Sequence, residues 1–150
     1  MKEQRNAFTL SFPSLAVNES FARASCAAFI AQLDPTLDEL NDIKTAVSEA
    51  VTNCIVHGYR DEIGVVQVSV KLLAPATAEI VVRDRGCGIP DIKQAREPMY
   101  TTGGAERSGM GFTIMESFMD EVVVRSQPGR GTTVRMKKAL SPRPGKRSAQ

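Results

Sequence analysis

Apolar and polar residues first alternate and then recur every three or four positions, which predicts a strand followed by helices. Residues 7–12 (AFTLSF) alternate as a half-buried strand does. A helix is predicted from Asn18, interpreted as its N-cap, to about Leu33, because Asp34-Pro35 would end it. The positions that recur with helical spacing in this segment are Phe21, Ser25, Ala28, Phe29 and Gln32.

The next segment has a clear helical pattern. Thr36 is followed three positions later by Glu39, the spacing of a capping box, and Gly58 is a natural stop after His57. The apolar stripe, with spacings of three and four, consists of Leu40, Ile43, Val47, Ala50, Val51 and Cys54. This stripe predicts a long amphipathic helix from Thr36 to about His57.

The second half of the chain combines strands with a long loop. Strands are predicted at residues 65–73 and 78–83 around a turn at Pro75, and at 121–126 and 132–138 around the turn QPGRG. Residues 84–111 hold eight glycines and prolines without a sustained period. Loops of this length inside a domain are usually functional or disordered. A short helix is predicted from Gly111 to Met119.

The order of these elements predicts an α+β fold. Consecutive strands that meet at short turns pair antiparallel, so we expect a two-layer sandwich of a mostly antiparallel, mixed sheet with helices on one face. Residues 1–140 are predicted to form one domain, and residues 141–150 (SPRPGKRSAQ) a flexible tail. The tail carries Arg143, Lys146 and Arg147 and no acid, so the basic surplus of the chain lies there.

Composition excludes several classes of protein. A chain of 150 residues, 42% of them apolar, suits one soluble globular domain. Apolar runs such as residues 26–31 are far shorter than the roughly 20 residues of a membrane span. The net charge of +2 and the absence of Trp make direct binding of nucleic acid a poor hypothesis. Cys26, Cys54 and Cys87 are interpreted as reduced thiols of a cytoplasmic protein.

Three polar residues, Glu49, Asn53 and His57, recur every four positions on the long helix. A solvated helix face explains such a trio, but residues 50–56 are unusually apolar and favour a covered cleft. In a cleft, Glu49 would activate a hydroxyl or a water molecule beside a hard cation held by Asn53. His57, the only histidine, is interpreted as a helix C-terminal residue favoured by the helix dipole.

The segment VVRDRGCGIPD is a second candidate. Asp84 ends a strand, and Gly86 and Gly88 allow the backbone to approach a flat ligand closely. A plain β-turn explains the same residues. The functional alternative is that Asp84 accepts a hydrogen bond from an exocyclic amine such as that of adenine.

The segment TTGGAERSGMGF is a third candidate. Gly109 and Gly111 open a predicted helix whose backbone amides would suit an anion, although a glycine pair alone is weak evidence. Gly103, Gly104 and Gly109 are interpreted as hinges of a mobile lid. Arg107 would reach phosphate oxygens or would simply be solvated.

Taken in order, these segments resemble the ATP-binding domain shared by gyrase, Hsp90, histidine kinases and MutL, the Bergerat-type ATP-binding fold. The resemblance spans about residues 40–136 and includes the Gly-Thr-Thr that enters the last strand. It implies ATP or ADP with Mg²⁺ as cofactors, Asn53 as the Mg²⁺ ligand and Asp84 as the residue that recognises adenine. It also implies that the nucleotide pocket includes Gly86, Gly88, Arg107, Ser108, Gly109, Gly111 and Thr133. Arg107 stands where family members often carry a glycine.

The chain is further similar to the small anti-sigma factors that are also serine kinases. The stretches NESFARA, FIAQLDPT, KTAVSEAVTN, HGY and RSGMGFTIMESFMD resemble the sporulation anti-sigma F factors, over most of residues 8–138. The resemblance implies a homodimer that binds sigma factor F and uses ATP to phosphorylate a serine of its anti-anti-sigma partner. Within this hypothesis Glu49 is the catalytic base, and Glu19 and Arg23 form the contact for both partners.

Two other functions stay open at this point. One is a nucleotide-gated module that binds sigma factor with little or no kinase activity, and the other is an ATPase that uses water as the acceptor. Glu19 and Arg23, one helical turn apart, also fit a simple surface ion pair. The phosphate contacts around Arg107 and the roles of Cys54 and Cys87 are open as well.

Overall fold

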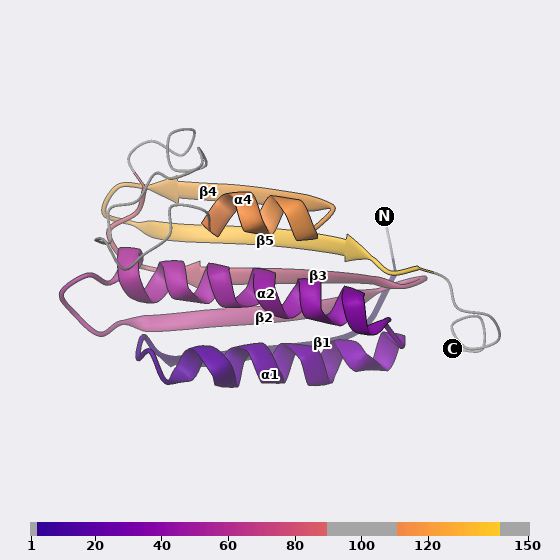
Figure 1. The fold of residues 1–150 in the computed structure, drawn as a ribbon. Helices are drawn as coiled ribbons and strands as arrows, with labels where there is room; N and C mark the ends of the chain where they lie inside the picture. Colours follow the sequence, from indigo (N-terminus) through magenta and orange to yellow (C-terminus); the bar gives the residue numbers. More distant parts are fainter. Residues whose placement is uncertain (1–2, 90–110, 142–150) are drawn as a thin grey trace.

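A five-stranded sheet forms one layer of the molecule, and the helices cover one of its faces (Figure 1). This computed structural model describes residues 3–89 and 111–141. The strands are β1 (Gln4–Pro13), β2 (Val65–Leu73), β3 (Thr77–Asp84), β4 (Glu121–Gln127) and β5 (Gly131–Ala139). Their order is β1-β2-β3-β5-β4, and each neighbouring pair is antiparallel. The α+β two-layer prediction is confirmed, with no parallel pair among the described strands.

Helix α2 lies at the centre of the helical layer. The helices are α1 (Asn18–Ile30), α2 (Leu37–Asn53) and α4 (Gly111–Phe118). A 3-10 turn at Ala31–Leu33 follows α1, and a π-helical turn at Cys54–Gly58 follows α2. Figure 1 shows α1 over β1 and β2, α2 over β2 and β3, and α4 over β4 and β5. Because α2 packs against both other helices, it connects the two halves of the layer.

The start of α2 is a capping box, as predicted. The Thr36 hydroxyl accepts a hydrogen bond from the Glu39 backbone N–H (3.1 Å), and the Glu39 carboxylate accepts one from the Thr36 N–H (2.9 Å). The second Glu39 oxygen accepts a bond from the Ser141 N–H (2.7 Å). Burial alone would raise the pKa of Glu39, but these hydrogen bonds outweigh it and lower the pKa. One carboxylate therefore joins the start of α2 to the residues that follow β5.

The hydrophobic core fills the space between the helices and one face of the sheet. Alternate residues of β2 and β3, such as Val68 and Ile80, are fully buried there. The predicted stripe of α2 is buried from Ile43 to Cys54, with Leu40 half-buried and Ala46 as an additional member. None of the helices described in the structure is long and apolar enough to cross a membrane.

Two predictions for α1 are wrong. Asn18 does not cap the helix; it is the first helical residue, and its side chain donates a hydrogen bond to the Pro13 carbonyl (3.0 Å). The buried positions are Ala22, Cys26 and Ile30, whereas Phe21 is 57% exposed. The small side chains of Ala22 and Cys26 allow α1 to approach its neighbours closely, so the buried face lies one residue away from the one that size and hydrophobicity suggested.

The capping box generates the first prediction. Thr36→Ala removes the acceptor for the Glu39 N–H and should lower the free energy of unfolding by about 1–2 kcal/mol. Thr36→Ser retains the hydroxyl and should stay close to the wild-type value. Urea denaturation followed by circular dichroism measures both variants. Equal losses for Ala and Ser would contradict a contribution from the cap.

Candidate functional site

Several elements meet at the end of the molecule where α2 and β3 terminate. The π-helical turn after α2 contacts β3 and β5, and α4 begins beside α2. This end lies at the left in Figure 1. It collects most of the described polar residues that the sequence singled out.

Asp84 is a buried carboxylate at the end of β3, with 5% of its surface exposed. One oxygen accepts a hydrogen bond from the Gly86 N–H (2.9 Å), and the carboxylate is also hydrogen-bonded to the Cys54 side chain. A Cβ atom at Gly58 would lie 2.9 Å from the Asp84 carboxylate, so the π-helical turn is in direct contact with it. A carboxylate has about four acceptor positions, so capacity for a further donor remains.

Burial dominates the electrostatics of Asp84. It raises the pKa of the carboxyl group, and the hydrogen bonds from Gly86, Cys54 and Thr132 lower the pKa without cancelling this effect. The pKa of the Cys54 thiol is raised well above its ordinary value, first by burial and then by the negative charge of Asp84. Cys54 therefore stays protonated and able to donate to Asp84.

The glycines after Asp84 are required by close backbone contacts. A side chain at Gly86 would collide with the Gly58 carbonyl, and one at Gly88, where φ is +77°, would collide with the Gln127 carbonyl. The Cys87 N–H also donates to the Gly58 carbonyl (2.9 Å). The glycines thus hold this loop against the end of the π-helical turn and against the β4–β5 connection.

Glu49 and Asn53 lie one turn apart on α2 and face the start of α4. A methyl group at Gly111 would lie 3.3 Å from both polar atoms of the Asn53 side chain and 3.6 Å from Glu49 Oε2. Both side chains are half-buried, and neither has a hydrogen-bond or ion-pair partner within residues 3–89 and 111–141. The first described turn of α4 is therefore next to an available carboxylate and an available carboxamide.

The sheet register puts Thr132, and not Thr133, on the same face of the sheet as Asp84. Thr132 is the cross-strand partner of Asp84, and its hydroxyl lies 2.8 Å from Ser126 Oγ. Thr133 is paired with the exposed Arg83, so its side chain lies on the opposite face of the sheet. Successive residues of a strand alternate between faces, so only one of the two threonines can face the site.

Two further residues of the site were not predicted. Tyr59 is 6% exposed; its hydroxyl donates to the Val65 carbonyl (2.8 Å) and accepts from the Arg85 N–H (2.7 Å). Ser126 Oγ accepts a hydrogen bond from the Ile89 N–H (2.7 Å). The sequence signal for Tyr59 was an aromatic residue directly after Gly58, the predicted helix stop. Nothing in the local sequence indicated a role for Ser126.

The remaining predictions concern residues outside the described structure and the three cysteines. Arg107, Ser108 and Gly109 lie outside the described residues. The three cysteines are free thiols, with Cys26 and Cys54 buried and Cys87 exposed. The Cys87 thiol donates to the His57 carbonyl (3.1 Å).

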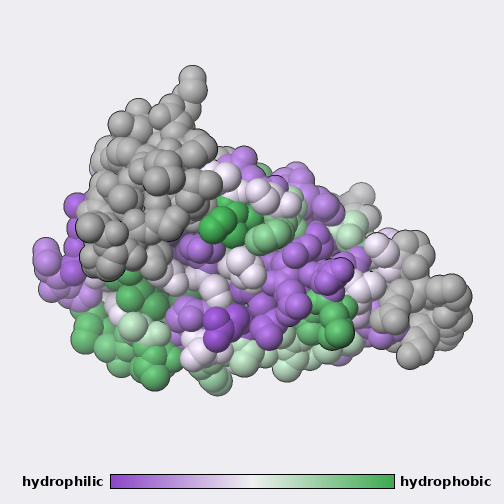
Figure 2. Space-filling view, in the orientation of Figure 1, coloured by the Kyte–Doolittle hydropathy of each residue, from purple (hydrophilic) through white to green (hydrophobic). Residues whose placement is uncertain are grey.

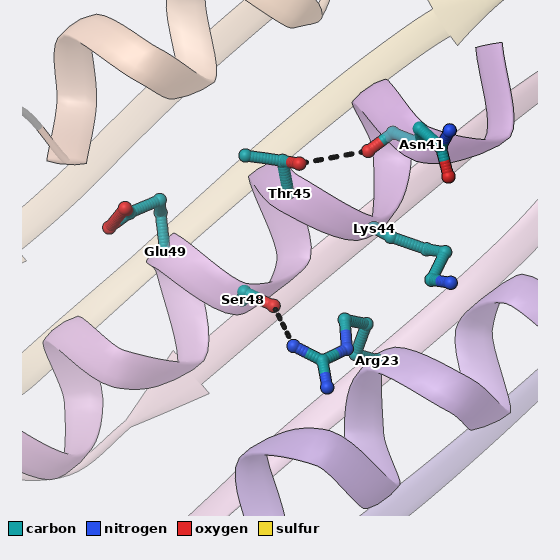
Figure 3. Close-up of a pocket in the computed structure, with 6 residues that line it drawn as sticks. All are labelled: Arg23, Asn41, Lys44, Thr45, Ser48 and Glu49. Carbon is teal, nitrogen blue, oxygen red and sulfur yellow. Dashed lines mark hydrogen bonds between the residues drawn. The ribbon is translucent and has the colours of Figure 1, made fainter. Parts of the chain in front are cut away.

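Glu19 and Arg23 on α1 form an ion pair (3.2 Å) that is also bonded to α2. Ser48 Oγ donates to Glu19 (2.6 Å) and accepts from Arg23 Nη1 (3.3 Å). Figure 3 shows the Arg23 bond to Ser48, with Glu49 as the next residue of α2. The pair is thus fixed against α2, and Ser48, which the sequence did not single out, is the residue that fixes it.

The chain matches the histidine kinase-like ATPase domain, whose family model covers residues 12–138. The fold also resembles the RsbU and RsbW domains of Rv1364c from Mycobacterium tuberculosis. That comparison has a TM-score of 0.69 and 20% identity, over 93% of this chain and 34% of that one. The histidine kinase domain of the Erythrobacter litoralis EL346 blue-light activated kinase gives a TM-score of 0.56 at 22% identity, over 81% and 60%. The chain is therefore an ATPase-type domain, a class that implies nucleotide binding.

Relatives with higher sequence identity define a more specific family within this class. An anti-sigma F factor of Geobacillus kaustophilus (strain HTA426) is 57% identical over 139 residues, which cover 91% of this chain and 94% of the relative. Another from Geobacillus stearothermophilus is 58% identical over 137 residues, covering 90% and 93%. The chain belongs to the anti-sigma F factor family of histidine kinase-like ATPase domains.

The raised pKa of Asp84 generates the second prediction. The folded protein binds this proton more tightly than the unfolded chain, so the stabilising contribution is present at low pH and is lost as pH rises through the folded-state pKa. Asp84→Asn removes the buried charge. Its stability relative to wild type should therefore increase as pH rises from about 3 to about 7.

Urea denaturation at a series of pH values measures this difference. Asp61→Asn, at an exposed position, is the matched control for the loss of a carboxylate. A difference between Asp84→Asn and wild type that stayed constant across the series would show that burial of Asp84 does not affect folding in this way.

Proposed function

We propose that this anti-sigma factor binds sigma factor F and is also an ATP-dependent serine kinase that phosphorylates its anti-anti-sigma partner. The observation that carries the kinase proposal is the pair of available side chains, Glu49 and Asn53, beside the start of α4. Membership of the anti-sigma F factor family supports the choice of partners. In this proposal the chain acts as a homodimer, as members of that family are expected to do.

Asp84 recognises the adenine base in this proposal. Its buried carboxylate has acceptor capacity left after the bonds from Gly86, Cys54 and Thr132, and an exocyclic amine supplies the matching donor. A hydrogen bond to a charged group contributes about 1.5–3 kcal/mol. Thr132, on the same face of the sheet as Asp84, is positioned to assist, in place of Thr133.

Asn53 is the proposed ligand of Mg²⁺. The residues that the structure describes contain no group of three His, Cys, Asp or Glu side chains that could hold a metal ion by themselves. The single carboxamide oxygen of Asn53 fits Mg²⁺, because this ion usually takes few ligands from the protein and is otherwise held by phosphate oxygens and water. The ion would supply positive charge that neutralises the phosphate oxygens of ATP.

Glu49 acts as the general base. In the transfer step the serine hydroxyl oxygen attacks the γ-phosphorus, its proton passes to Glu49, and the bond from the γ-phosphorus to the bridging oxygen breaks to release ADP. The start of α4 lies beside Glu49, and its backbone amides favour the negative phosphate groups. The main task of the chain is thus to position the two reactants.

The third prediction separates chemistry from binding. Glu49→Gln keeps the shape of the side chain but removes its basicity, so phosphoryl transfer should fall by about 10²- to 10⁴-fold. Binding of ATP and of sigma factor should be retained. The measurement is transfer of label from γ-labelled ATP to the partner protein, and Glu62→Gln, an exposed carboxylate, is the matched control.

The wild-type protein in the same assay tests the proposed function itself. Release of free phosphate without labelled partner would indicate an ATPase. Binding of sigma factor with neither product would indicate a nucleotide-gated binding module. Undiminished transfer by Glu49→Gln would show that Glu49 is not the base.

The fourth prediction concerns Glu19 and Arg23, the proposed contact for both partners. Because Ser48 holds Arg23 in place, its guanidinium is preorganised to bind a carboxylate of a partner with two parallel hydrogen bonds. Arg23→Ala should weaken binding of sigma factor and of the anti-anti-sigma substrate by about 2–5 kcal/mol. Ser48→Ala should have a smaller effect in the same direction.

Surface plasmon resonance with each partner measures these losses. Affinity for ATP should be unchanged in both variants, and Arg125→Ala, at an exposed position of β4, is the control. Wild-type affinity of Arg23→Ala for both partners would place the shared contact elsewhere on the surface.

A further inference from the structure

A polar groove lies along the outward side of α2 and leads away from Glu49. It has a volume of about 470 Å³ and is bounded on one side by Arg23 of α1 (Figure 3). Figure 2 shows hydrophilic residues over this middle part of the helix-covered face. The residues that line the groove are Arg23, Asn41, Lys44, Thr45, Ser48 and Glu49.

Lys44 carries a positive charge in this groove that is not compensated by another side chain. It is half-buried, and within residues 3–89 and 111–141 its ammonium group has no hydrogen-bond or ion-pair partner. Arg23, by contrast, is paired with Glu19 at 3.2 Å. The Thr45 hydroxyl donates to the Asn41 carbonyl (2.9 Å). The groove therefore offers one available cation, Lys44, beside the neutral polar residues Asn41, Thr45 and Ser48. The carboxylate of Glu49 lies at one end of the groove, so an acidic ligand group is favoured at Lys44 and not at that end.

The groove is also the open side of the proposed base. The start of α4 lies on the other side of Glu49, where a methyl group at Gly111 would be 3.6 Å from Glu49 Oε2. A serine whose hydroxyl reaches Glu49 brings a flanking peptide segment with it. That segment can continue over the groove, where it passes Lys44.

The spacing of Glu49 and Lys44 sets the length of this segment. The two residues are five positions apart, which is about 7.5 Å along the helix axis. Their side chains also diverge around α2, as Figure 3 shows. An extended peptide advances about 3.3 Å per residue, so the axial rise alone takes two to three residues, and the divergence of the side chains adds to this span.

We propose that Lys44 binds an acidic side chain of the anti-anti-sigma substrate that lies at least two to three residues from the acceptor serine. This inference rests on the proposed kinase function and adds a substrate-recognition residue to it. Lys44 acts in substrate binding and not in the chemical step, since it lies away from Glu49 and Asn53.

Kinetics with the intact substrate protein test this proposal. Lys44→Ala and Lys44→Glu should raise the KM for the substrate about tenfold or more, with kcat and affinity for ATP close to wild type. Lys71→Ala is the matched control, because Lys71 is an exposed lysine of β2 on the uncovered face of the sheet. An unchanged KM for Lys44→Glu would overturn the proposal.

A charge exchange identifies the side chain that Lys44 contacts. Each acidic residue two or more positions from the acceptor serine in its flanking segments is changed to Lys in the substrate and tested with Lys44→Glu. One such pair should bring the KM most of the way back to the wild-type value. Failure of every pair would overturn the assignment. A loss of sigma factor affinity as large as the loss of substrate affinity would overturn it too, because Lys44 would then be a contact shared by both partners.

Affinity for the unphosphorylated substrate, measured by calorimetry, keeps the two proposals distinguishable. If the wild-type protein transferred no phosphate, the proposed kinase function would fail, but Lys44→Glu should still weaken binding of the substrate about tenfold. If the wild type transferred phosphate and Lys44→Glu bound the substrate normally, only the role of Lys44 would fail.

Discussion

The burial of one face of α2 determines both the core and the candidate site. Ile43, Val47 and Val51 are fully buried between this helix and its neighbours, and each such side chain contributes about 1.5–3 kcal/mol relative to an exposed one. The same burial fixes the rotation of the helix about its axis. Because residues advance by about 100° each, Ser48 and Glu49 must then lie on the outward side. The positions of the polar groups therefore follow from the packing of the apolar ones.

The end of α2 connects this helix to Asp84 in the candidate site. Beyond Asn53 the chain forms a π-helical turn, in which the Tyr59 N–H donates to the Cys54 carbonyl (3.0 Å). The wider turn brings Gly58 against Asp84 and directs the Cys54 thiol to the same carboxylate. Such turns are often found at functional sites, because they change the direction of side chains without ending the helix abruptly.

How far the sequence predicted this structure depends on the range of the interactions. The period of α2, its capping box and the strand pairs were predictable because each is set by residues close in the chain. The buried face of α1 was not, since Ala22 and Cys26 are buried for their small size, which matters only once the neighbours are in place. Thr133 was chosen from a motif, and only the register of β3 and β5 reveals that Thr132 faces Asp84. Ser48 required knowledge of how α1 meets α2.

The adjacency of Ser48 and Glu49 gives the proposed kinase a simple way to align its substrate. Ser48 bonds to the ion pair on α1, while Glu49 faces the start of α4 and lies one turn from Asn53. Both belong to the same turn of a helix that is held by the core on its other side. A partner that binds Arg23 is therefore placed at a fixed distance from the base and from the phosphates, and such positioning supplies a large part of the acceleration in phosphoryl transfer. In this proposal, recognition and chemistry both depend on residues of one helix.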